Sequence, residues 1–318
     1  MQAADIQETP IKQNPKTGSG DKIFSRLTLF FALCVVLLML GMIIALNIDA
    51  IPSISKFGLG FITGTTWNAV TEQFGALPAI FGTLLSAFLG LIIAVPLSFG
   101  AAIFLVELAP RWIRGPGSFL IEMLAAIPSV IIGLWGLFVL IPFVRDPIEK
   151  WLGHALGFLP FFQGPPLGLG FLASGIILAI MILPIITAMS RDVIKAVPNT
   201  QREAMLALGA TRWETIRQVV LPYCRSGLVG AVILGLGRAL GETMAVTMVI
   251  GNQYIISPSL FSPGTTIASK IAGEFGEAAG NVFISSLVEL ALVLFAVTLL
   301  VNIIARLLVW RMTTVRPD

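Results

Sequence analysis

Six long runs of apolar residues constrain this chain more than any other feature of its sequence. They lie at about 27–46, 79–106, 118–143, 169–189, 227–250 and 282–305. A helix of about 20 apolar residues crosses the hydrocarbon core of a bilayer, and each run reaches that length. Hydrophobic residues make up 56% of the 318 residues and charged residues only 12%, which excludes an ordinary soluble domain. The sequence therefore predicts an all-α polytopic membrane protein with six transmembrane helices.

The segments between these runs predict how the chain is organised. Residues 1–22 are polar and contain several Pro and Gly, which is typical of a disordered tail. The first transmembrane helix is expected within 23–48, as an anchor, because no cleavage-site pattern follows it. Residues 49–78 are expected to form a periplasmic loop at the membrane interface, residues 79–306 the membrane core and residues 307–318 a second tail.

The distribution of Lys and Arg predicts the orientation of the chain. Fifteen of the twenty lie in the N-terminal tail, in the segments 110–117 and 190–226, and at the C-terminal end. Four lie on the alternate side, and Arg238 lies within an apolar run. Because cytoplasmic loops carry the excess of Lys and Arg, both termini and the segment 190–226 are expected in the cytoplasm.

The longest charged interruption is residues 199–222, and its pattern predicts two short helices. Two Thr-x-x-Glu pairs have the spacing of capping boxes, Thr200 with Glu203 and Thr211 with Glu214. Gly209 stands between them, where a left-handed residue is expected to end the first helix. Pro222 is expected to end the second helix.

The second of these helices carries one apolar stripe. The residues that recur at helical spacing are Trp213, Ile216, Val219 and Val220. Such a stripe can cover the membrane core of this chain, or it can be offered to a partner protein. The residue pattern alone leaves both interpretations open.

This segment resembles the EAA loop of ABC-importer permeases. That loop has Glu-Ala-Ala, three residues, Gly, nine residues, Ile, one residue and Leu-Pro. The positions in register are Glu203, Ala204, Gly209, Leu221 and Pro222, while Met205 and Val219 replace the second Ala and the Ile. The resemblance implies that the loop couples the permease to a cytosolic ATPase. No G-x-x-x-x-G-K-[ST] occurs in the sequence, so ATP and Mg²⁺ are expected on the partner ATPase, and no cofactor is expected on this chain.

Four ionisable residues fall within the predicted spans: Glu122, Arg238, Glu242 and Glu289. Arg238 and Glu242 are four residues apart, so they are expected to pair on one helix face. The pair either fixes the packing of two membrane helices or places an arginine on an anion path, since guanidinium binds oxyanions through several donors. Gly237 and Gly241 form a G-x-x-x-G, which favours close approach of another helix.

The remaining polar residues and the cysteines are given simpler interpretations. Glu122 is expected near the cytoplasmic start of its span, and Glu289 is expected to hydrogen-bond between helices. His154 is expected in a solvated loop. Cys34 and Cys224 have no metal-type spacing, and both are expected to be inert.

Four further stretches resemble the PstC-type permease subunits of phosphate-specific ABC transporters. These are VPLSFGAAIFLVELAP at 95–110, MLAAIPSV at 123–130, ILAIMILP at 177–184 and GLGRALGETMAVTMVIGN at 235–252. The resemblance implies the type I ABC importer (MetI-like) permease fold, and it places Arg238 and Glu242 on a phosphate path. It also implies a second, PstA-like permease, a PstB-like ATPase dimer and a periplasmic, PstS-like phosphate-binding protein as partners.

The resulting expectation is a permease subunit, not an enzyme, in the inner membrane of a bacterium. Three alternatives stay open: a permease for another oxyanion such as sulfate or molybdate, the paired phosphate permease, and a second role in phosphate signalling. A secondary transporter driven by an ion gradient would need no docking site for an ATPase. The capping pairs around Gly209, in register with the EAA pattern, argue against that class.

Overall fold

The computed structural model describes residues 19–314, with side chains as far as residue 307. It is almost entirely helical, and six helices in the described part are long and apolar enough to cross a membrane. This confirms the predicted number of spans. Their bounds are 20–57, 77–108, 129–156, 171–195, 212–241 and 281–307. Of the predicted tails, residues 1–18 and 315–318 lie outside the described residues, whereas 19–22 and 307–314 belong to helices.

The chain divides into two compact units, Met1–Ile48 and Asp49–Asp318. The described part of the first unit is the larger part of helix α1, Ser19–Phe57. The predicted first span lies inside this helix, whose last turns belong to the second unit. Many apolar side chains of α1 are exposed, including Phe31 and Leu38, as expected for a helix in contact with lipid or with another chain.

The second unit contains all the other elements. Its membrane helices are α3 (Leu77–Ile103) with η1 (Phe104–Leu108), α8 (Phe171–Lys195), α11 (Leu221–Gly241) and α14 (Asn281–Thr314). The helices between α3 and α8 are α4 (Arg111–Ala125), α5 (Ser129–Trp135), η2 (Gly136–Leu140), α6 (Ile141–Phe143), η3 (Val144–Glu149), α7 (Lys150–Leu156) and η4 (Pro160–Phe162). The short elements are α2 (Gly60–Thr63), β1 (Trp67–Asn68), β2 (Gln73–Phe74), α9 (Asn199–Ala207), α10 (Arg212–Thr215), η5 (Ile216–Val220), α12 (Met244–Val249) and α13 (Ile267–Glu274).

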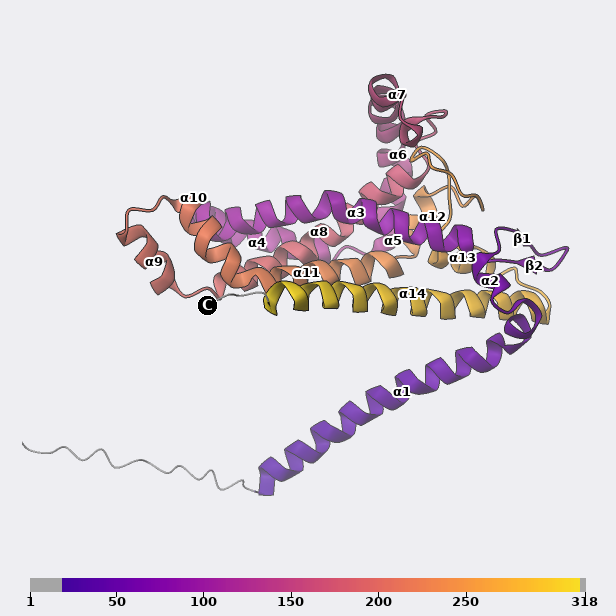
Figure 1. Cartoon of the computed structure of the whole chain (residues 1–318), viewed down its shortest axis with the longest axis horizontal. Coiled ribbons are helices and arrows are strands. Elements are labelled where there is room, and N and C mark those ends of the chain that lie inside the picture. The colour runs from indigo at the N-terminus through magenta and orange to yellow at the C-terminus, as the bar shows by residue number, and fades with distance from the viewer. Residues whose placement is uncertain (1–18, 315–318) are drawn as a thin grey trace, which may run out of the picture. The chain divides into compact units, whose positions relative to one another are not determined.

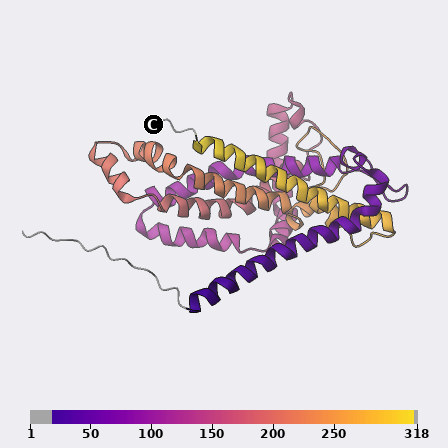
Figure 2. The same ribbon diagram turned by 60° about the horizontal axis from the view of Figure 1, so that its bottom comes forward.

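Helices α3, α8, α11 and α14 run side by side in this unit (Figures 1 and 2). Helix α8 is the most buried of the six membrane helices, and its Phe171, Leu178 and Ile182 form the core with small residues of α3 and α11. Close approach depends on glycine, because a Cβ at Gly175 would lie 2.7 Å from Leu89 Cβ. The helices α9 and α10 lie at one end of the bundle, and α13 with the β1–β2 hairpin lies at the other (Figure 1).

The third membrane helix differs from the prediction in position. The apolar run at 118–143 is divided by Pro128 into α4 and the helical segment 129–156. Proline has no N–H and disfavours a helical conformation in the residue before it, so α4 ends at Ala125 and a new helix starts at Ser129. The predicted loop at 144–168 is consequently helical as far as Leu156. By contrast, Pro96 and Pro184 lie inside α3 and α8 without ending them.

An aromatic cluster lies at the end of the bundle opposite α9 and α10. Trp67 of β1 lies against Phe74 and Tyr254, with ring centroids 4.9 and 5.6 Å apart. Lys270 of α13 lies 4.7 Å from the Tyr254 ring centroid, and its Nζ is 2.6 Å from Glu274 Oε1. Because the cation is held between aromatic faces and a carboxylate, α13 is fixed to the β-hairpin.

We expect Tyr254→Phe to lower the stability of this cluster by about 1–2 kcal/mol, because the Tyr254 hydroxyl donates to the buried Gly75 carbonyl. Burial and the nearby Glu274 raise the pKa of Tyr254. The folded protein should therefore lose stability as pH rises above about 10, where the unfolded chain ionises this group. The apparent Tm in detergent as a function of pH measures both effects, and the Phe variant should lack this part of the alkaline decline.

Candidate functional site

The first candidate site is the α9–α10 hairpin, which contains the predicted coupling residues. Helix α9 ends in a Schellman motif: Ala210 N–H donates to Met205 O at 3.1 Å and Gly209 N–H to Leu206 O at 3.0 Å. Gly209 has φ +86°, so the predicted left-handed C-cap is confirmed. The capping box of Thr211 with Glu214 is also confirmed.

The predicted capping box of Thr200 with Glu203 is wrong. Helix α9 begins at Asn199, directly after Pro198, so Thr200 is already inside the first turn. Its side chain makes no cap hydrogen bond. The N-cap residue is Pro198, whose side chain makes no cap hydrogen bond.

The prediction that Pro222 ends the second helix is also wrong. The helix that starts at Arg212 passes through the π-helical segment η5 and continues as α11 to Gly241. Pro222 is the second residue of α11. A π-helical turn leaves the regular i→i−4 hydrogen-bond ladder, so a residue without N–H can follow it at little cost. The hairpin is therefore joined rigidly to a membrane helix.

The hairpin buries only part of its apolar stripe. Ile216 and Val220 are buried in the permease, whereas Trp213 is 62% exposed and Leu208, in the turn, is 84% exposed. Glu203 and Ala204 are exposed as well, and Glu203 has no hydrogen bond or ion pair among residues 49–307. The packing of one side against the membrane core is thus confirmed, whereas docking of a partner on the exposed side stays a prediction.

An ion pair that sequence reasoning missed fixes the hairpin to the membrane core. Arg202 Nη2 lies 2.9 Å from Glu107 Oε1, and both side chains are 15% exposed. The Arg202 guanidinium also donates to the carbonyls of Ile194 and Val197 and to Asn199 Oδ1. Breaking such a pair leaves a poorly solvated charge, so this contact resists separation of α9 from η1.

The second candidate site is the end of α11, where Arg238 and Glu242 lie close together. Helix α11 ends at Gly241, and Glu242 is its extended C-cap residue. Arg238 Nη2 and Glu242 Oε2 are 3.8 Å apart, with the arginine side chain 41% exposed and the glutamate side chain 7% exposed. The predicted pairing is confirmed, but at this distance it is electrostatic and the arginine keeps its hydrogen-bond donors available.

One stripe of α11 meets no other element of the second unit. A Cβ placed at Gly230, Gly237 or Gly241 would have no atom within 4 Å, and Leu234 is exposed beside them. These residues share the helix face of Arg238 at spacings of three and four. The expected packing at the G-x-x-x-G is therefore absent within residues 49–307, and Gly227 and Gly235 contact α8 instead. The open stripe (Gly230, Leu234, Gly237, Arg238 and Gly241) is available to a partner or to solvent.

The other predicted intramembrane charges are bound within the chain. Glu122 Oε1 lies 2.9 Å from Arg191 Nη1 and joins α4 to α8. Glu289 accepts from Ser53, whose hydroxyl is also 3.0 Å from Ser286 Oγ. This confirms the expectation that Glu289 bridges helices. Glu122 and Glu289 both have partners within hydrogen-bond distance, whereas Arg238 has only the 3.8 Å contact with Glu242.

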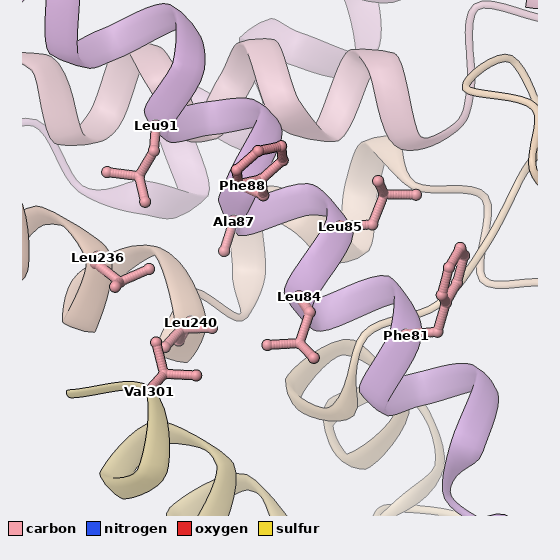
Figure 3. A pocket seen from close by; sticks show the side chains of 9 residues that line it. All are labelled: Phe81, Leu84, Leu85, Ala87, Phe88, Leu91, Leu236, Leu240 and Val301. Carbon is pink, nitrogen blue, oxygen red and sulfur yellow. The ribbon is translucent and has the colours of Figure 1, made fainter. Parts of the chain in front are cut away.

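A large apolar groove of about 450 Å³ lies between α3, α11 and α14. Figure 3 shows its side chains, among them Phe88 and Leu91 of α3, Leu240 of α11 and Val301 of α14. All of the residues that line it are apolar, so it offers no side-chain donor to an oxyanion. The groove suits a hydrocarbon chain better than an anion.

The sequence of this chain is similar to those of known transport proteins. Residues 94–314 match the family described as "Binding-protein-dependent transport system inner membrane component". The chain is 51% identical to the phosphate transport system permease protein PstC of Haemophilus influenzae over 296 residues, which is 92% of this chain and 94% of the relative. It is 50% identical to PstC of Pasteurella multocida over 91% of both chains.

Solved structures agree on the fold. A chain of a bacterial alginate ABC transporter, in complex with a periplasmic protein bound to an alginate pentasaccharide, has a TM-score of 0.60 at 16% identity. The match covers 93% of this chain and 96% of that chain. At that identity the likeness establishes the architecture only.

Proposed function

Because this chain belongs to the binding-protein-dependent transport system inner membrane components, we propose that it is a permease subunit of an ATP-driven phosphate importer. The identity of 51% to PstC of Haemophilus influenzae, over almost the full length of both chains, is the observation that carries the proposal. The chain is a multi-pass membrane protein, and we place it in the inner membrane of a bacterium.

The open stripe on α11 forms part of the translocation path in this proposal. Arg238 presents a cation with free donors, and a planar guanidinium binds a tetrahedral oxyanion through two oxygens at once. Glu242, mostly buried at 3.8 Å, orients the arginine and moderates its field. A second, PstA-like permease closes the path on the other side, because the glycines of the stripe permit its close approach.

The hairpin couples this path to ATP hydrolysis. Its exposed Leu208, Trp213 and Glu203 form a contact surface for one subunit of a PstB-like ATPase dimer, which binds ATP and Mg²⁺. Within the hairpin, Ala204 and Gly209 shape the docking turn, and Leu221 and Pro222 join it to α11. A PstS-like receptor delivers phosphate at the opposite end. This chain makes and breaks no covalent bond, and transport proceeds by alternating access.

The orientation follows from the arrangement of charge. Arg114 lines the same cavity as Arg202 and Arg212, so the segments 110–117 and 190–226 lie at one end of the unit. These are two of the segments that carry the excess of Lys and Arg. By the positive-inside rule this end, with the hairpin, faces the cytoplasm.

Uptake of labelled phosphate by cells that lack this gene tests the function directly. Wild-type chain should restore uptake only when the receptor and ATPase are present, and excess unlabelled phosphate should compete at least tenfold better than sulfate or molybdate. Restored uptake of sulfate or molybdate without phosphate uptake would contradict the proposal and indicate a permease for another oxyanion. If this chain and the second permease replace each other freely, the assignment between the two permeases is wrong.

A further inference from the structure

A cavity of about 240 Å³ lies between the α9–α10 hairpin and the adjacent ends of η1 and α4. Four charged residues line it: Glu107 of η1, Arg114 of α4, Arg202 of α9 and Arg212 of α10. We propose that this cavity binds inorganic phosphate on the side to which the transporter delivers it. The inference rests on the proposed function, since it assigns a product site to the same transporter.

Arg202 and Glu107 do not contribute free binding groups. The Arg202 Nε and Nη2 both donate to Glu107 Oε1, at 3.1 and 2.9 Å. The remaining Arg202 donors go to Ile194 O, Val197 O and Asn199 Oδ1. A guanidinium has five N–H groups, so this set satisfies the arginine, and the carboxylate neutralises its charge.

Arg114 and Arg212 supply the binding chemistry. Arg114 donates through Nε to Ala109 O at 2.8 Å, and its terminal nitrogens have no hydrogen-bond partner among residues 49–307. The Arg212 side chain makes no hydrogen bond or ion pair among the same residues. The cavity therefore keeps two positively charged side chains with free donors. Two such groups match the charge and the several acceptor oxygens of phosphate.

The position of the cavity favours a small free anion over a side chain of the ATPase. It lies on the inner side of the hairpin, lined by η1 and α4 of the membrane core. Leu208, the C-cap residue of α9, is 84% exposed. The turn that follows it, between α9 and α10, lies at one end of the bundle (Figure 1). A partner that docks on this turn leaves the cavity on the inner side of the hairpin accessible to small solutes.

Phosphate bound here would connect α4 to α10. Arg114 belongs to the membrane core, whereas Arg212 starts the helix that leads from the hairpin to Arg238. An anion shared between them ties the hairpin in one position relative to the core. Because coupling requires the hairpin to move with the ATPase, occupancy should slow the transport cycle when product accumulates.

The test uses the complete transporter in liposomes, with the ATPase outside and the loaded receptor inside. Initial ATPase rates are measured by ADP release while phosphate outside is titrated, with chloride at matched ionic strength as the reference. Wild type should be inhibited, and Arg114→Gln with Arg212→Gln should raise the half-inhibitory phosphate concentration at least tenfold. Arg217→Gln, an exposed arginine of η5 outside the cavity, should leave it unchanged.

Several outcomes would overturn the proposal. Inhibition that is equal in wild type and the double variant would locate product inhibition in the ATPase. An equal shift with Arg217→Gln would indicate a general surface charge effect. Loss of ATPase co-purification in the double variant, with Arg212→Lys restoring it but not the phosphate response, would show that the cavity accepts a partner carboxylate. Absence of receptor-dependent phosphate uptake would instead contradict the proposed function itself.

Discussion

Arg238→Gln should reduce phosphate uptake at least tenfold while the variant still assembles with its partners. A hydrogen bond to a charged group is worth about 1.5–3 kcal/mol, and about 1.4 kcal/mol corresponds to a factor of ten. The substitution keeps most of the side-chain length and removes the charge that attracts the anion. Because Arg238 is exposed on α11 and its one ion pair is long, its loss should disturb the fold little. Labelled uptake and co-purification of the complex give the two measurements.

Two matched variants sharpen this prediction. Arg238→Lys keeps the charge without the planar fork, so its uptake should fall between those of wild type and Arg238→Gln. Arg217→Gln removes an exposed arginine at the hairpin and should retain full uptake. Normal uptake by Arg238→Gln would make the arginine a packing residue. Loss of the assembled complex would point the same way, because the open stripe would then serve mainly to hold the second permease.

Gly209→Pro should abolish coupling between the ATPase and transport, with membrane insertion intact. Gly209 has φ +86°, and the proline ring fixes φ near −65°, so the turn between α9 and α10 cannot form as it is. The substitution also removes the N–H that donates to Leu206 O. Receptor-stimulated ATPase activity should fall at least tenfold, and phosphate uptake should fall with it.

Gly209→Asn is the control, because asparagine tolerates the left-handed conformation better than other residues with a Cβ. It should retain most of the stimulated activity. Glu203→Lys, which reverses an exposed and unpaired charge, should weaken ATPase co-purification without changing the turn. If Gly209→Pro binds the ATPase and transports normally, the hairpin is not the coupling element.

The elements that could be predicted from sequence are those set by local physics. The length of the apolar runs predicted six spans, and the Thr-x-x-Glu spacing at Thr211 predicted a capping box. The glycine at 209 predicted a left-handed turn, and the structure contains all three. Each depends on residues within a few positions of one another. The four-residue spacing of Arg238 and Glu242 placed them near each other for the same reason.

The elements that could not be predicted depend on distant residues or on backbone states without a sequence signature. Pro128 separates two helices, whereas Pro96, Pro184 and Pro222 lie within helices, and the local sequence does not distinguish these cases. Arg202 and Glu107 are 95 positions apart, so their pairing cannot be predicted before the fold is known. The G-x-x-x-G predicted close approach of another helix, but in the second unit Gly237 and Gly241 have no such neighbour, and only the fold shows this.

The continuous helix from Arg212 to Gly241 can transmit motion from the hairpin to the opposite end of the helix. Its thirty residues amount to a rod of roughly 45 Å, with the docking turn at one end and Arg238 near the other. A tilt of about 10° around the midpoint would displace each end by about 4 Å, which exceeds the reach of a hydrogen bond. Motion of an ATPase subunit at the hairpin would thus displace Arg238 at the other end of the helix. The π-helical segment would determine how stiff the helix is next to the hairpin.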